Sequence, residues 1–443
     1  MTKKQGIFSF LFALYWMILW FSINSQMPEN LLFTINLIDF SENIFQSLNF
    51  SRLILALFCT LLIILYFIFI FFLTSNKINK IYLFTILAFF SQLVGLYLNE
   101  ERSFNIWNSR LPILAIGTVC LFILCDQVKV NNIIKYFFWI TILILIAVSI
   151  TIISPKITEL KNLDFYSLFN PLDKNIIGGD NPRISGISRT LSIINLFLIL
   201  YFFNLKNFYI KYFLLIVISM LTLIILLMES RGTLLSYFIS LSFIILFLIK
   251  KSTIFRVKYF LILIIFPIIL SFFIFNNYTN KEIFDKGGTS IQTEKVINSR
   301  LFAQHSGGRV AIWSYIFKNY DYKKVFGYGP QGDRFFLKKN PYLEKGYGDN
   351  SSNNLIYTML SGGLVSVFFW ILIFFEILKI FIKQKKYFLF NKSNYYLNFS
   401  ISCLIFFLLR SMIENSFALF SIDFLIIYLS IVYILNSSKI SKK

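Results

Sequence analysis

Long apolar runs recur along the whole chain, and they constrain its fold more than any other feature. Runs such as residues 53–74 and 259–276 extend over roughly 18 to 22 residues, the length that a helix needs to cross the hydrocarbon core of a bilayer. Charged residues make up 14% of the chain, whereas ordinary soluble domains carry about 25%. The sequence therefore predicts an all-α polytopic membrane protein.

The apolar runs predict about twelve transmembrane helices, with both chain ends on the cytoplasmic side. The expected spans lie at about residues 7–24, 53–74, 81–98, 111–125, 136–153, 190–205, 212–228, 233–249, 259–276, from 355 onward, 396–413 and 416–435. No sustained repeat relates the two halves of the chain. This disfavours a transporter, because transporters are often built from inverted repeats.

A polar insert between spans nine and ten divides the chain into three parts. We expect residues 1–276 to hold nine spans with short loops, and residues 355–443 to hold the last three. Residues 277–354 are expected to form one large outer loop. A polar insert of this size in a membrane protein indicates chemistry on one side of the bilayer.

The formal net charge of +21 does not indicate nucleic-acid binding, because of where the lysines lie. Many of them occupy short loops between the apolar runs, as Lys250 and Lys251 do. Short basic loops are expected on the cytoplasmic side of a membrane protein. The partner that this composition predicts is the lipid bilayer, and no nucleic acid is expected.

The four cysteines all lie inside apolar runs. They offer neither a disulfide framework nor the spacing of metal ligands. No metal site and no other cofactor are therefore expected.

Arginine is distributed differently from lysine. On the expected topology, Arg256 is the one cytoplasmic residue among eleven arginines. The guanidinium group binds phosphate oxygens through two parallel hydrogen bonds and tolerates partial desolvation better than an ammonium group does. We infer an anionic, phosphate-bearing ligand at the outer face. The ten arginines expected there are Arg52, Arg102, Arg110, Arg183, Arg189, Arg231, Arg300, Arg309, Arg334 and Arg410.

Local ion pairs are the alternative explanation for these arginines. Arg231 and Arg410 stand out because each adjoins an apolar run, where a charge is usually either functional or paired. Glu229 and Glu414 are both candidate partners of Arg231. Arg410 lies one helical turn before Glu414, a spacing that favours a structural pair.

Several short motifs follow one another between residues 180 and 370. They are Arg183-Ile184-Ser185-Gly186, Glu229-Ser230-Arg231-Gly232, Gly308-Arg309-Val310-Ala311-Ile312-Trp313, Gly327-Tyr328-Gly329, and Ser352-Asn353 with Gly363-Leu364. Their order, spacing and position relative to the spans resemble the O-antigen ligase and polymerase family of bacterial membrane glycosyltransferases. The resemblance implies a GT-C-like fold in the bacterial inner membrane. It also implies action at the periplasmic face on glycans carried by undecaprenyl pyrophosphate, both as donor and as acceptor.

One departure from the family pattern bears on the type of enzyme. Ligases of this family carry a histidine in a His-Asn pair, where this chain has Ser352 and Asn353. The single histidine, His305, lies at the opposite end of the insert, where we expect an exposed loop residue. The resemblance therefore favours an O-antigen polymerase. The alternatives are a ligase that transfers the glycan to lipid A core and a flippase for lipid-linked oligosaccharides, although a flippase would not need the large outer insert.

The expected chemistry centres on Arg231 and Arg309 as catalytic residues. They would clamp the pyrophosphate of the donor and stabilise the charge that develops on the leaving group, without a metal ion. The sequence does not rank the candidates for a general base, which are Asp349, Asp333 and Glu229. The residues expected to bind substrate are Arg183, Arg410, Trp313, Asn353, Glu229 and Asp349. A chain-length-determinant co-polymerase is the expected protein partner.

Overall fold

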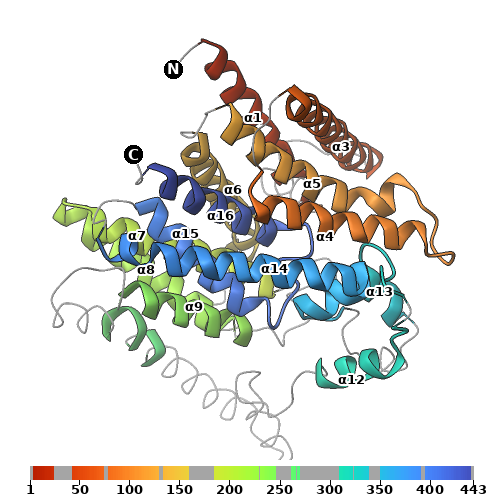
Figure 1. The fold of residues 1–443 in the computed structure, drawn as a ribbon. Helices are drawn as coiled ribbons and strands as arrows, with labels where there is room; N and C mark the ends of the chain where they lie inside the picture. The colour runs from red at the N-terminus through yellow and green to blue at the C-terminus, as the bar shows by residue number, and fades with distance from the viewer. Residues whose placement is uncertain are drawn as a thin grey trace, which may run out of the picture.

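The computed structural model describes most of the chain. The described residues are 3–23, 42–73, 78–128, 133–158, 184–228, 230–245, 261–265, 267–269, 309–322, 324–338, 350–390 and 395–440. Every regular element within these ranges is a helix (Figure 1). In chain order they are α1 (Lys3–Ile23), α3 (Glu42–Leu73), α4 (Lys80–Tyr97), α5 (Ile106–Gln127), α6 (Ile133–Thr158), α7 (Ile184–Asn204), α8 (Phe208–Leu227), α9 (Arg231–Phe243), the π-helix η3 (Leu261–Ile265), α12 (Arg309–Asn319), α13 (Gly332–Leu337), α14 (Asn354–Phe390), α15 (Tyr395–Arg410) and α16 (Ile422–Ile440).

The described helices confirm a polytopic membrane protein of the all-α class. Eight of them are long and apolar enough to cross a bilayer, namely α1, α3, α4, α5, α6, α7, α8 and α14. The shorter apolar helices α15 and α16, together with α9, correspond to three further predicted spans. The predicted ninth span lies mostly outside the described residues, so the number twelve stays a prediction.

The helices pack side by side around α4 and α14, which lie next to each other over much of their length (Figure 1). On one side, α5 joins α4 to α3; on the other, α15 contacts α9 and α16, and α7 contacts α8. Lipid tails are as apolar as leucine, so close packing and interhelical hydrogen bonds have to hold such helices together. One such bond joins Tyr15 on α1 to Thr60 on α3 at 2.9 Å, and another runs from Asn195 on α7 to the Tyr237 hydroxyl on α9 at 2.9 Å.

Helix α14 is interrupted at Gly363, which has φ 68° and ψ −166°. The interruption leaves the carbonyl oxygens of Leu360 and Ser361 available to a neighbouring loop. They accept hydrogen bonds from the backbone N–H groups of Tyr328, at 2.8 Å, and Gly329, at 3.0 Å. The loop that carries the Gly-x-Gly motif is therefore docked onto the kink in α14.

Glycine is required here because the backbones approach very closely. A Cβ atom on Gly363 would overlap the carbonyl oxygen of Val325, and one on Gly327 would lie 2.6 Å from the Gly363 nitrogen. Both glycines also have positive φ, a conformation that is strained for other residues. On the other side of the loop, Arg102 donates to the carbonyl oxygens of Tyr328, at 2.9 Å, and Pro330, at 2.8 Å.

A small second core forms where the insert meets the bundle. Helices α12 and α13 lie together at one end of α14, on the right in Figure 1. Ile312, Ile316, Tyr320 and Tyr328 are buried there against Met359 and other residues of α14. Tyr320 and Tyr328 thus serve packing in this second core.

Arginine gathers at the same end of the bundle as α12 and α13. Arg102 follows the C-terminal end of α4, Arg231 and Arg309 begin α9 and α12, and Arg410 ends α15. Lysines such as Lys80, the first residue of α4, lie at the opposite ends of their helices. The separation of arginine from lysine that the sequence predicted is thus only partial among the described residues, because Lys318 on α12 and Lys324 beside Tyr328 lie at the arginine end.

Candidate active site

The turn at residues 411–421, between α15 and α16, is the centre around which the arginines gather. It is fixed to the start of α14 by Asn354, whose side chain is buried. The Asn354 Oδ1 accepts hydrogen bonds from the backbone N–H groups of Phe417, at 3.0 Å, and Ala418, at 2.8 Å. The Asn354 N–H donates to the Ser411 carbonyl oxygen at 3.0 Å. The turn therefore has one defined position relative to α14.

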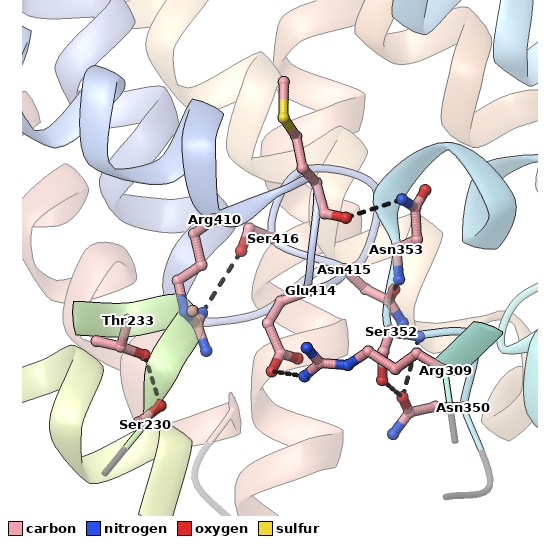
Figure 2. A network of polar contacts seen from close by, with 12 residues as sticks. Ser230, Thr233, Arg309, Asn350, Ser352, Asn353, Arg410, Glu414, Asn415 and Ser416 are labelled. Carbon is pink, nitrogen blue, oxygen red and sulfur yellow. Dashed lines mark hydrogen bonds and ion pairs between the residues drawn. The ribbon is translucent and has the colours of Figure 1, made fainter. Parts of the chain in front are cut away.

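Asn353, predicted to bind substrate, caps the N-terminus of α14. Its Oδ1 accepts from the N–H groups of Leu355 and Ile356 at 2.9 and 3.1 Å, and its Nδ2 donates to the Met412 carbonyl oxygen at 2.9 Å (Figure 2). Asparagine is a favoured residue at this position because its oxygen satisfies orphan N–H groups. Both ends of the Asn353 amide thus have protein partners, and a role in substrate binding stays a prediction.

Asp333 on α13 links its own helix to Ser351 and to the 411–421 turn. Its Oδ2 accepts from Ser351 N–H at 3.0 Å and from Asn415 Nδ2 at 3.3 Å, and its Oδ1 accepts from Arg334 N–H at 2.9 Å. Burial raises the pKa of this carboxyl group above its ordinary value, and the hydrogen bonds oppose part of that rise. Asp333, one of the predicted candidates for the general base, is 1% exposed and holds the loops together.

Arg410 forms a buried ion pair with Asp423, the second residue of α16, and not with Glu414. The Nη1 of Arg410 lies 2.6 Å from Asp423 Oδ2, and the Nη1 of Arg189 lies 2.7 Å from Asp423 Oδ1. Ser416 donates its hydroxyl to the same carboxylate at 2.8 Å. One carboxylate therefore fixes two guanidinium groups that come from α7 and α15.

Arg309 is the partner of Glu414. Its Nη2 lies 3.6 Å from Glu414 Oε1, and the two side chains are 37% and 30% exposed (Figure 2). Arg309 is the first residue of α12, and this helix is held in place partly by Trp313, whose Nε1 donates to the Ser351 carbonyl oxygen at 2.7 Å. The indole N–H of Trp313, predicted to bind substrate, is thus engaged by the protein, and its contact with substrate stays a prediction.

Arg231 is exposed at the first position of α9. Gly232 next to it faces the 411–421 turn, because a Cβ atom there would lie 3.2 Å from Ile413 Cδ1. The N-cap residue Ser230 makes no capping hydrogen bond with its side chain, which instead donates to the Thr233 hydroxyl at 3.0 Å (Figure 2). The first turn of α9, which carries Arg231, thus lies beside the turn that also borders Arg309 and Arg410.

The described part of this end combines four arginines with three carboxylates, those of Glu414, Asp423 and Asp333. Arg189, Arg231, Arg309 and Arg410 come from four different helices and surround a turn that carries Glu414 and precedes Asp423. Helices α9 and α12 also direct their N-termini, with their partial positive charge, toward this end. An excess of positive charge in a partly buried place is suited to an anion with several oxygen atoms, such as a diphosphate.

Some predicted site residues lie outside the described residues. These are Arg183, Glu229, Asp349 and His305, and their roles stay predictions. Among the residues that the structure describes, no group of three or more His, Cys, Asp or Glu side chains could hold a metal ion.

The sequence analysis gave no role to Asp423 and did not single out Arg189. It favoured an ion pair between Glu414 and Arg410, whereas Glu414 pairs with Arg309. A signal was available for Asp423, since an acidic residue inside an apolar run is costly unless it has a partner. No comparable signal connects Arg309 with Glu414, which are separated by more than a hundred residues and by α14 and α15.

Comparison with known proteins agrees with the sequence motifs. The family model described as O-antigen ligase matches residues 214–371, from α8 to the first half of α14. This range includes Arg231, Arg309 and the Ser352-Asn353 pair, and over it the chain is similar to that family. The match does not separate a polymerase from a ligase. No curated protein and no solved structure matches the chain.

Proposed function

We propose that this protein belongs to the O-antigen ligase and polymerase family and is a polymerase of O-antigen or of a related surface polysaccharide. Its substrates are two oligosaccharide repeat units, each carried by undecaprenyl pyrophosphate. The reaction takes place at the periplasmic face of the bacterial inner membrane, with both chain termini in the cytoplasm. A chain-length-determinant co-polymerase is the proposed protein partner.

The observation that carries this proposal is the convergence of arginines from α7, α9, α12 and α15 on the 411–421 turn. The guanidinium groups of Arg189 and Arg410 are fixed by Asp423. Arg309 and Arg231 retain exposed surface. A membrane protein that holds fixed and accessible guanidinium groups together at one end of its bundle is suited to a lipid diphosphate, whose lipid tail stays in the bilayer.

The proposed reaction uses this charge for leaving-group stabilisation. Arg231 and Arg309 bind the pyrophosphate of the donor, with Arg183 as a further binding residue. Arg410, predicted from the sequence to bind substrate, is 3% exposed and paired with Asp423, and it positions the 411–421 turn. The hydroxyl oxygen of the acceptor attacks the anomeric carbon of the donor sugar, and the sugar–phosphate bond breaks as the new glycosidic bond forms. The departing pyrophosphate takes the electron pair, and preorganised guanidinium groups stabilise its growing charge. No metal ion takes part in the proposed step.

A polymerase is proposed in preference to a ligase because of Ser352 and Asn353, which stand where ligases carry a His-Asn pair. In this chain Asn353 caps α14, and Ser352 donates its hydroxyl to Asn350 Oδ1 at 2.6 Å. The description of the matching family model as O-antigen ligase favours the alternative, transfer of the glycan to lipid A core.

Deletion of the gene, followed by gel electrophoresis of lipopolysaccharide, tests the two functions against each other. A polymerase deletion leaves one repeat unit on the core, whereas a ligase deletion leaves the core undecorated. Undecorated core would overturn the polymerase proposal.

Substitution of the two arginines tests the proposed clamp. Arg231→Ala and Arg309→Ala should each remove the ladder of polymer while the protein stays in the membrane, since losing one electrostatic donor typically slows catalysis by about 10²–10³-fold. Arg→Lys at either position should restore little activity, because a point charge does not reproduce the two-donor geometry. Lys318→Ala is the matched control, an exposed cation on the same helix as Arg309, and should keep the ladder. Full polymer from both alanine variants would remove these residues from the mechanism.

A further inference from the structure

Glu414 occupies the centre of the arginine cluster. Its backbone N–H donates to the Arg410 carbonyl oxygen at 2.9 Å, just beyond the C-terminal end of α15. Its carboxylate lies 3.6 Å from Arg309 and also interacts electrostatically with Arg189. Figure 2 shows the Glu414 side chain directed toward Arg309, away from Asn353. This carboxylate therefore lies where the proposed function puts the reacting sugar phosphate.

The other described carboxylates at this site are committed to structure. Asp333 is 1% exposed and accepts hydrogen bonds from three segments. Asp423 is 3% exposed and lies within 2.7 Å of two arginines. A general base must reach the proton that it removes, and neither group has a path to one. Glu414, with a side chain that is 30% exposed, is accessible to a substrate hydroxyl.

The contact between Glu414 and Arg309 is of a kind that an anion can replace. At 3.6 Å it is longer than a charge-assisted hydrogen bond, which spans about 2.7–2.9 Å, and both side chains are more than a quarter exposed. Partly exposed ion pairs of this type contribute little stability. A phosphate oxygen that binds Arg309 would compete with the carboxylate and release it.

We propose that Glu414 is the general base of the glycosyl transfer. The inference rests on the proposed function and names a catalytic residue that the sequence did not offer. When the donor pyrophosphate binds Arg309, the Glu414 carboxylate turns to the acceptor hydroxyl and takes its proton. The acceptor oxygen forms the bond to the anomeric carbon, and the sugar–phosphate bond breaks with its electron pair going to undecaprenyl pyrophosphate. The proton remains on Glu414 until water removes it.

The variants Glu414→Gln and Glu414→Asp test this role in the full-length protein. Glu414→Gln keeps the size and polarity of the side chain but cannot accept the proton, so polymerisation should slow by about 10²–10⁴-fold, the usual contribution of general base catalysis. Glu414→Asp keeps the carboxylate and should restore part of the ladder. Glu376→Gln is the matched control, because Glu376 also pairs with a cation, Lys379 at 2.6 Å, but far along α14 from this site. It should polymerise like the wild type.

Binding of undecaprenyl pyrophosphate to the protein in nanodiscs distinguishes a general base at Glu414 from a role in binding the pyrophosphate, as proposed for Arg231 and Arg309. Glu414→Gln should bind this lipid at least as tightly as the wild type, because a competing carboxylate has been removed, whereas Arg309→Ala should bind it at least tenfold more weakly. A wild-type ladder from Glu414→Gln, at normal protein levels, would overturn the proposal. A loss of lipid binding in Glu414→Gln that equals the loss in Arg309→Ala would also overturn it, since Glu414 would then support the clamp. Normal binding and activity in Arg309→Ala would instead count against the proposed function.

Discussion

Replacement of Asp423 by asparagine should destabilise the protein far more than loss of an ordinary ion pair. Asp423→Asn leaves the size of the side chain unchanged but removes the charge that faces Arg410 at 2.6 Å and Arg189 at 2.7 Å. The Arg410 and Asp423 side chains are 3% and 4% exposed. Breaking a buried pair by removing one partner costs about 3–5 kcal/mol, because the remaining charge is buried without compensation. Here two guanidinium groups lose that compensation, so we expect the upper part of this range.

The Glu376–Lys379 pair provides a control with the same separation of charges. Its N–O distance is also 2.6 Å, but Lys379 is 59% exposed and Glu376 is 21% exposed. Exposed pairs contribute at most about 1 kcal/mol, so Glu376→Gln should have a small effect. Unfolding by increasing SDS in mixed micelles, followed by tryptophan fluorescence, measures both variants. If Asp423→Asn unfolds at the same SDS fraction as Glu376→Gln, burial does not set the strength of the Asp423 pairs.

A triple variant separates stability from function at the same place. Leucine at positions 189, 410 and 423 removes the whole ionic group, and apolar replacement of a complete buried ion pair is often neutral or stabilising. The triple variant should therefore unfold later than Asp423→Asn. It should still produce no polymer, because two of the guanidinium groups that make this end of the bundle positive are lost.

Two further predictions concern the kink and the topology. Gly363→Ala should lower resistance to SDS and weaken the polymer ladder, because a Cβ atom there would overlap the Val325 carbonyl oxygen. Gly6→Ala is the control and should change neither property, because a Cβ atom there would meet nothing within 4 Å. Equal behaviour of the two variants would contradict this account of the kink. Lys318 and Lys206 are both exposed. The Lys318→Cys variant should react with an impermeant thiol reagent in intact spheroplasts, and the Lys206→Cys variant should not. The opposite labelling would invert the expected topology.

The sequence was sufficient to predict the helices, because apolar runs of bilayer length have few other stable forms. It was also sufficient to predict that arginines gather at one end, since the direction of each span follows from the lysines beside it. The predicted ends of the spans differ from the helix ends by a few residues in most cases, as with residues 81–98 and α4 at Lys80–Tyr97.

The sequence did not predict which residues pair with the arginines. The helical spacing of Arg410 and Glu414 predicted a pair, but α15 ends at Arg410 and the chain turns away, so Glu414 leaves that face of the helix. Arg102 was expected to serve an anionic ligand, yet its guanidinium group donates to two carbonyl oxygens of the Gly-x-Gly loop. Both outcomes depend on where helices end and on which loops dock, which short spacing rules do not encode.

The kink at Gly363 has a consequence for how the protein is assembled in the membrane. A translocon releases helices into lipid one after another, but α14 as seen here has carbonyl groups at Leu360 and Ser361 that are satisfied by Tyr328 and Gly329. A carbonyl group left without a donor in lipid costs several kcal/mol. The kinked form of α14 is thus available only once the loop with Tyr328 and Gly329 has folded against it. In biogenesis, docking of residues 324–338 and completion of this helix become a single event.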